Sequence, residues 1–203
     1  REVVMRRFAE VALWAASLPV CLTTVGCAET ATRFIADSTG DMILSASPRL
    51  NAQWDYELFE EGLPGSLIMM ESVIAVSPDN MPMRLELARN YSSYGYGWLE
   101  DRYEKAEIEG DLDRADRLRA RTRLTYLRAR ELGLSVMRRH HPGIDRALKE
   151  GDADLERYLK AQYVFAEDAP ALFWTAMAWG SAVNLGRDDP DLIADLGTVK
   201  ILA

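Results

Sequence analysis

Apolar residues recur three or four positions apart along most of this chain, and short polar turns separate the runs. Three such runs cover about 63–76, 83–103 and 114–139, with turns at SPDN (77–80) and EGDLD (109–113). This spacing places apolar side chains on common faces of α-helices. Nothing alternates with the period of a strand over a useful length. The sequence therefore predicts an all-α protein, an array or bundle of antiparallel helical hairpins.

The first 26 residues have the pattern of an export signal. A basic stretch, MRRF, precedes the apolar, uncharged segment from Val11 to Gly26. At 16 residues this segment is shorter than the ~20 that a transmembrane helix needs. The ending TVGC resembles the lipobox of bacterial lipoproteins, in which the peptide is cut before the cysteine and lipid is attached to it. Thr24 stands where that family most often has leucine.

We therefore predict a lipoprotein-type signal peptide over 1–26, with Cys27 as the lipidation site. The alternative is that Cys27 is a bystander thiol in a signal that is cut elsewhere. Residues 27–47 are expected to form the lipidated N-terminus and a tether leading into weak helix. The helical-hairpin domain is expected over 48–203. It ends inside an apolar helical pattern and the chain starts with Arg1, so we expect a fragment, truncated at the C-terminus.

Charge and the reactive residue types exclude several function classes. The net charge of −8 argues against nucleic acid as a partner. No cysteine follows Cys27, which excludes disulfides and thiolate chemistry from the rest of the chain. His140 and His141 are adjacent, so on a helix they do not form a facing metal pair. The arginine-rich run over 114–130 is interleaved with acidic residues and predicts a solvated helix face. We expect no catalytic residue, metal or cofactor.

The stretch PALFWTAMAWGSAVNLG, from Pro170 to Gly186, is uncharged and contains two tryptophans. It could be a membrane span, a buried helix of the core or the wall of an apolar ligand site. A buried helix is favoured, because the stretch is short for a span and contains Thr175, Ser181 and Asn184.

Aromatic residues cluster in two of the expected helices, beside glycine and alanine. Large rings next to small residues can leave an apolar cavity, although most such rings belong to the core. The candidate ligand-binding residues are Tyr91, Tyr94, Trp98, Phe173, Trp174 and Trp179.

Three ordered segments resemble the T-component (TatT) family of TRAP transporters. They are ESVIAVSPDNMPMRLELARNYSSYGYGWLE, LTYLRARELGLSVMRRHHPG and PALFWTAMAWGSAVNLGRDDPDLIADLGTVK. The resemblance covers roughly Asp55 to the end. It implies a tetratricopeptide-like α-superhelix, exported to the periplasm and anchored by lipid to a bacterial membrane. It has no established catalytic residues to carry over.

The resemblance also implies a function. It indicates a non-catalytic adaptor that docks a periplasmic solute-binding protein of a TRAP transporter, for uptake of a small organic ligand. It leaves open a hydrophobic ligand and a homo-oligomer. One alternative is an autonomous carrier lipoprotein that holds a hydrophobic molecule in its own cavity. Another is a hydrolase that uses carboxylates, for which no spacing singles out a pair.

Overall fold

The computed structural model describes residues 28–203, and this part of the chain is helical without any strand. The all-α prediction is confirmed. The predicted signal peptide and Cys27 lie outside the described residues. A helix over 28–50 comes first. It is followed by α2 (Tyr56–Val76), α3 (Met81–Tyr94), the π-helical segment η1 (Gly95–Leu99), α4 (Glu100–Glu109), α5 (Leu112–His140), α6 (Ile144–Glu150), α7 (Asp152–Gln162), the 3₁₀ turn η2 (Ala166–Asp168), α8 (Ala169–Leu185), α9 (Pro190–Ala194) and α10 (Leu196–Leu202).

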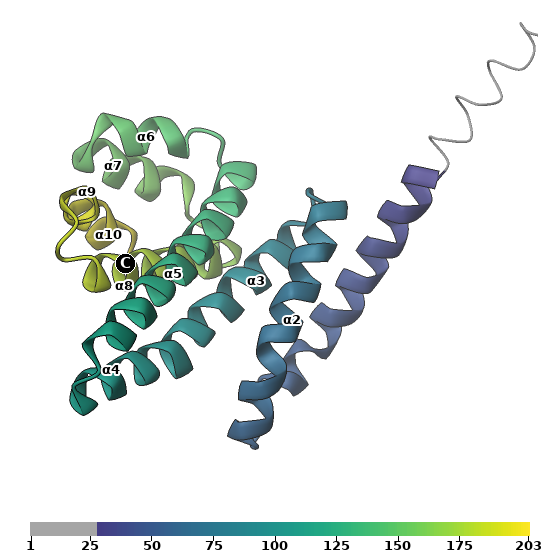
Figure 1. Cartoon of the computed structure of the whole chain (residues 1–203). Helices are drawn as coiled ribbons and strands as arrows, with labels where there is room; N and C mark the ends of the chain where they lie inside the picture. The colour runs from purple at the N-terminus through teal and green to yellow at the C-terminus, as the bar shows by residue number, and fades with distance from the viewer. Residues whose placement is uncertain (1–27) are drawn as a thin grey trace, which may run out of the picture.

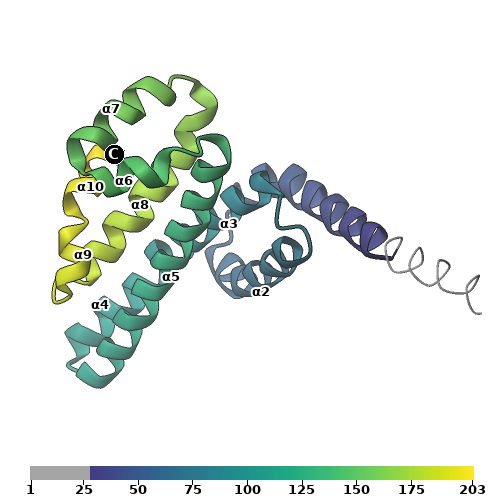
Figure 2. The same ribbon diagram turned by 90° about the horizontal axis from the view of Figure 1, so that it is seen from above.

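The helix over 28–50 lies beside α2 and against α3 (Figures 1 and 2). Its inner face buries Ala36, Ile43 and Ser47. Asp37 accepts hydrogen bonds from Ser77 and from Asn80 in the turn between α2 and α3. The sequence predicts a tether leading into weak helix here, because serine, threonine, aspartate and glycine weaken helix propensity. Burial of one face against two other helices stabilises a helix that propensity alone would not predict.

Side-chain caps fix the starts of the helices in this half of the molecule. Asp55 accepts from the backbone N–H of Leu58 at the start of α2, at 3.0 Å. Asn80 does the same for α3 and Asp111 for α5. The apolar pattern indicates a helix that begins near Leu63. The cap at Asp55 explains why α2 begins earlier, at Tyr56.

One continuous helical rod runs through α3, η1 and α4 and turns back into α5. The turn contains Gly110 with a φ of 77°, a left-handed conformation that glycine adopts at little cost. The rod widens to a π-helix at Gly95, where the backbone meets the ring of Tyr126. A Cβ on Gly95 would lie 2.8 Å from that ring. The two helices therefore approach closely where η1 faces α5.

α5 and α8 form the centre of the fold. The short helices α6, α7, α9 and α10 cover their ends (Figure 1). The uncharged stretch from Pro170 to Gly186 corresponds to α8. The alanines of this stretch and Thr175 are buried against α5 and α10. Among the described residues, no helix combines the length and hydropathy that crossing a bilayer requires.

Arginines of α5 form ion pairs with acidic residues on neighbouring segments of the chain. Arg119 pairs with Asp188 at 2.7 Å and also donates to the carbonyl oxygen of Leu185. Arg128 pairs with Glu71 of α2. The run that the sequence predicts as a solvated face therefore also supplies ion pairs to neighbouring segments.

Candidate functional site

Three of the predicted ligand-binding aromatics lie on the rod, and two of them pack against each other. Tyr94 and Trp98 are buried, and their ring centroids lie 6.2 Å apart. Trp98 also stacks on Tyr56 at 5.1 Å and lies 5.6 Å from Phe59. These rings therefore fill the space between α2 and η1.

Tyr91, the third of this group, is half-buried where α2, α3 and α5 meet. Its hydroxyl donates to Glu71 at 3.0 Å, and burial together with this carboxylate raises the pKa of Tyr91 to about 12. Burial acts to raise the pKa of Glu71, but the hydrogen bonds and charge of Arg128 outweigh it, and the net shift is downward. The Tyr91 hydroxyl thus adds a hydrogen bond to the ion pair between Glu71 of α2 and Arg128 of α5.

The three aromatics of α8 point in different directions. Phe173 is 57% exposed and packs edge-on against Trp174, with ring centroids 4.9 Å apart. Trp179 is buried, donates its indole N–H to Asp195 at 2.8 Å, and lies under the guanidinium of Arg130. No ring contact joins the α8 aromatics to the cluster on the rod within the described part of the chain. The structure does not bring the six residues together.

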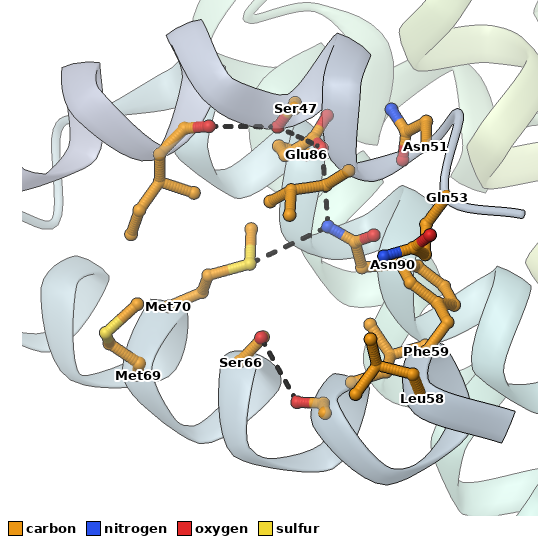
Figure 3. Close-up of a pocket in the computed structure, with 14 residues that line it drawn as sticks. Ser47, Asn51, Gln53, Leu58, Phe59, Ser66, Met69, Met70, Glu86 and Asn90 are labelled. Atoms are coloured by element: carbon orange, nitrogen blue, oxygen red, sulfur yellow. Dashed lines mark hydrogen bonds between the residues drawn. The ribbon is translucent and has the colours of Figure 1, made fainter. Parts of the chain in front are cut away.

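A pocket of about 280 Å³ lies instead between the helix over 28–50, α2 and α3 (Figure 3). A mostly apolar wall and a small polar group are the usual composition of a site for a small organic molecule. We call Ser47, Glu86 and Asn90 the polar group; the polar residues Asn51, Gln53 and Ser66 also line the pocket. The apolar wall includes Ile43, Leu58, Phe59, Leu63, Met69 and Met70.

The polar group of the pocket forms one hydrogen-bonded network. Oε1 of Glu86 accepts from the Ser47 hydroxyl at 2.7 Å, from the Asn90 amide at 3.4 Å, and from Arg89. The same Asn90 amide nitrogen approaches the sulfur of Met70 at 3.6 Å (Figure 3). The network thus links all three helices around the pocket.

Only one of the six predicted aromatics borders this region. Trp174 lines a second hollow of about 320 Å³, which shares Ser47, Asn51 and Glu86 with the pocket. The sequence prediction missed the pocket because one of its walls is the helix over 28–50, expected to be a tether. One usable signal was present: Glu86 and Asn90 are four residues apart on a predicted helix and so share a face.

Neither histidine lines the pocket, and the two side chains have different surroundings. His140 is exposed at the end of α5, whereas Nε2 of His141 lies 2.8 Å from Oδ1 of the buried Asp168. The His141 ring also packs on Tyr163, with centroids 4.1 Å apart. This pair joins the end of α5 to the segment before α8.

Comparison with protein families gives one finding. The model of the TRAP transporter T-component family matches residues 52–203. No curated protein and no solved structure matches the chain.

Proposed function

The chain belongs to the TRAP transporter T-component family, and we propose that it acts as a non-catalytic adaptor that docks a solute-binding protein. Membership makes it a component of a TRAP transport system, and the resemblance described above is confirmed. The finer role is our proposal. It includes a tetratricopeptide-like helical array, an exported and lipid-anchored location, and a pocket that holds a small organic ligand.

The observation that carries the ligand-binding part is the pocket among the helix over 28–50, α2 and α3. Its volume of about 280 Å³ lies just below the lower end of the range of ordinary ligand pockets. Methionine side chains, as at Met69 and Met70, adapt their shape to irregular apolar ligands. A small apolar molecule can therefore be held here without any catalytic group.

The chain around the mouth of this pocket supports docking of a protein. Leu50 and Leu58 line the pocket and are each more than half exposed. Trp54, in the segment that connects them, is 88% exposed. Tryptophan is typical of the residues that contribute most to protein interfaces. We propose this rim as the contact with the solute-binding protein.

Replacing Trp54 with alanine is expected to reduce recovery of the solute-binding protein about tenfold or more in an in-cell crosslinking pull-down. The reason is that a central interface tryptophan commonly contributes 2 kcal/mol or more to binding. Partners would be identified and quantified by mass spectrometry. Ile108→Ala is the matched control, because Ile108 is 87% exposed but lies on α4. Equal recovery with both variants would rule out the rim as the contact, and recovery of the protein alone from wild-type cells would argue against the adaptor role.

The lipid anchor rests on the sequence TVGC that precedes the described residues. If lipid is attached at Cys27, Cys27→Ala should move the protein from the membrane fraction into the soluble exported fraction. The reason is that the acyl chains, rather than any helix, would hold it on the bilayer. Fractionation followed by immunoblotting measures this, with Cys21→Ala as the control that should stay in the membrane fraction. A Cys27→Ala protein that remains in the membrane fraction would contradict lipid anchoring at this residue.

The autonomous carrier is the second candidate, and the same pocket favours it. A carrier would co-purify with its hydrophobic ligand and without a stoichiometric protein partner. The crosslinking experiment therefore separates the two roles, since only the adaptor requires the solute-binding protein.

A further inference from the structure

We propose that the pocket selects ligands whose apolar body ends in a hydrogen-bond donor, a hydroxyl or an amine, and that Glu86 is the residue that determines this preference. The inference rests on the proposed role of the pocket as a ligand site. It names the chemical class of ligand, which the family membership leaves open.

The first step is the charge of the pocket. Of the described residues that line it, Glu86 is the only one with a formal charge, and no lysine, arginine or histidine is among them. Arg89 pairs with Glu86 and lines the adjoining hollow beside Trp174, but it is not part of the lining of this pocket. A ligand carboxylate would therefore meet a carboxylate of the same sign and no cation within the pocket. Like charges in a partly buried site are costly, because the surrounding medium screens them less than water does.

The second step is the direction of the hydrogen bonds. The hydroxyls that line the pocket already donate within the protein: the buried Ser47 to Glu86, and the exposed Ser66 to the carbonyl oxygen of Gly62, at 3.2 Å. The Asn90 amide nitrogen faces two acceptors, Oε1 of Glu86 and the sulfur of Met70. A carbonyl oxygen in its place would face two acceptors with no hydrogen to share, so the network fixes the orientation of this amide.

The third step is to identify the hydrogen-bonding atoms of the pocket that remain available to a ligand. Asn90 turns its nitrogen to the network, which leaves its carbonyl oxygen as an acceptor (Figure 3). Oε2 of Glu86 makes no hydrogen bond within the part of the chain that the structure describes. The interior thus offers acceptors. The side-chain amides of Asn51 and Gln53 lie on exposed residues at its edge. A hydroxyl or amine can satisfy such acceptors, whereas a carboxylate brings only further acceptors.

The test compares three water-soluble probes that share one alkyl chain: hexan-1-ol, hexylamine and hexanoate. Binding is measured by calorimetry on the full lipoprotein in lipid nanodiscs, with empty nanodiscs subtracting partition into lipid. We expect the alcohol and the amine to bind about tenfold more tightly than hexanoate, the size of one hydrogen bond to a charged acceptor. In Glu86→Gln, we expect the preference over hexanoate to fall to about twofold or less, because the repulsion is removed.

Glu156→Gln is the matched control, since Glu156 also pairs with a nearby cation but lies on α7. It should keep the wild-type order of the three probes. Equal binding of all three probes to the wild type would overturn the inference and leave the pocket as a ligand site. A preference over hexanoate that is unchanged in Glu86→Gln would have the same meaning. Failure of every probe to bind would overturn both the inference and the ligand-binding part of the proposed function. The docking part is judged separately by the crosslinking experiment.

Discussion

Replacing Gly133 with leucine is expected to lower the free energy of unfolding by about 3 kcal/mol or more, a large share of the stability of an ordinary domain. Gly133 lies on α5 where this helix closely approaches α8 at Thr175. A Cβ there would lie 3.2 Å from Cβ of Thr175 and 3.4 Å from its Cα, and closer still to its hydroxyl oxygen. Thr175 is fully buried, so a larger side chain at 133 must separate the two central helices. Urea denaturation followed by circular dichroism measures the change.

Three further variants keep this prediction testable if the leucine protein does not fold. Gly65→Ala, on α2 with open space around it, should stabilise by about 0.5–1 kcal/mol, as expected for a glycine in a helix interior. Gly133→Ala should destabilise alone, and adding Thr175→Ala should recover at least about 0.5 kcal/mol, because residues in contact do not act additively. A Gly133→Ala protein as stable as Gly65→Ala would mean that α5 and α8 do not pack as described.

The packing of α5 on α8 shows which features of this fold can be predicted from the sequence and which cannot. The helix predicted over 114–139 is α5 with nearly the same bounds, because a long apolar stripe and the cap at Asp111 both specify it. The contact between Gly133 and Thr175 joins residues far apart in the chain, and no local pattern indicates which glycine faces which helix. The type and bounds of α5 were therefore predictable, and the residues with which it packs were not.

The candidate site was less predictable for a related reason. Large aromatic residues indicated the site, but Tyr94 and Trp98 are themselves the filling between helices. The pocket arises where smaller or flexible side chains, such as Ser66 and Met69, leave space against the helix over 28–50. That helix forms through burial rather than through its own propensity, so a reading of local propensity misses both the helix and the pocket. Glu86 and Asn90, four residues apart on a helix that the sequence did predict, could have been identified in advance as sharing one face.

Ser66→Phe is the second large expected effect, a loss of about tenfold or more in hexan-1-ol binding. Ser66 lies on α2 and lines the pocket, and its hydroxyl bonds only to the carbonyl oxygen of Gly62 in its own helix. The phenylalanine ring would occupy space that the ligand needs, and about tenfold corresponds to about 1.4 kcal/mol of binding free energy. The measurement is calorimetry in nanodiscs, with the folded state checked by circular dichroism.

Ser72→Phe provides a close control for this prediction. Ser72 is also an exposed serine of α2, and its hydroxyl donates to the carbonyl oxygen of Ile68 at 3.0 Å. It does not line the pocket, so both variants add the same ring to the same helix, and only Ser66→Phe should lose binding. Equal losses in both would trace the effect to α2 as a whole rather than to the pocket. If Ser66→Phe loses the ligand and still recovers the solute-binding protein, ligand binding and docking use separate parts of this surface, because Trp54 outside the pocket remains intact.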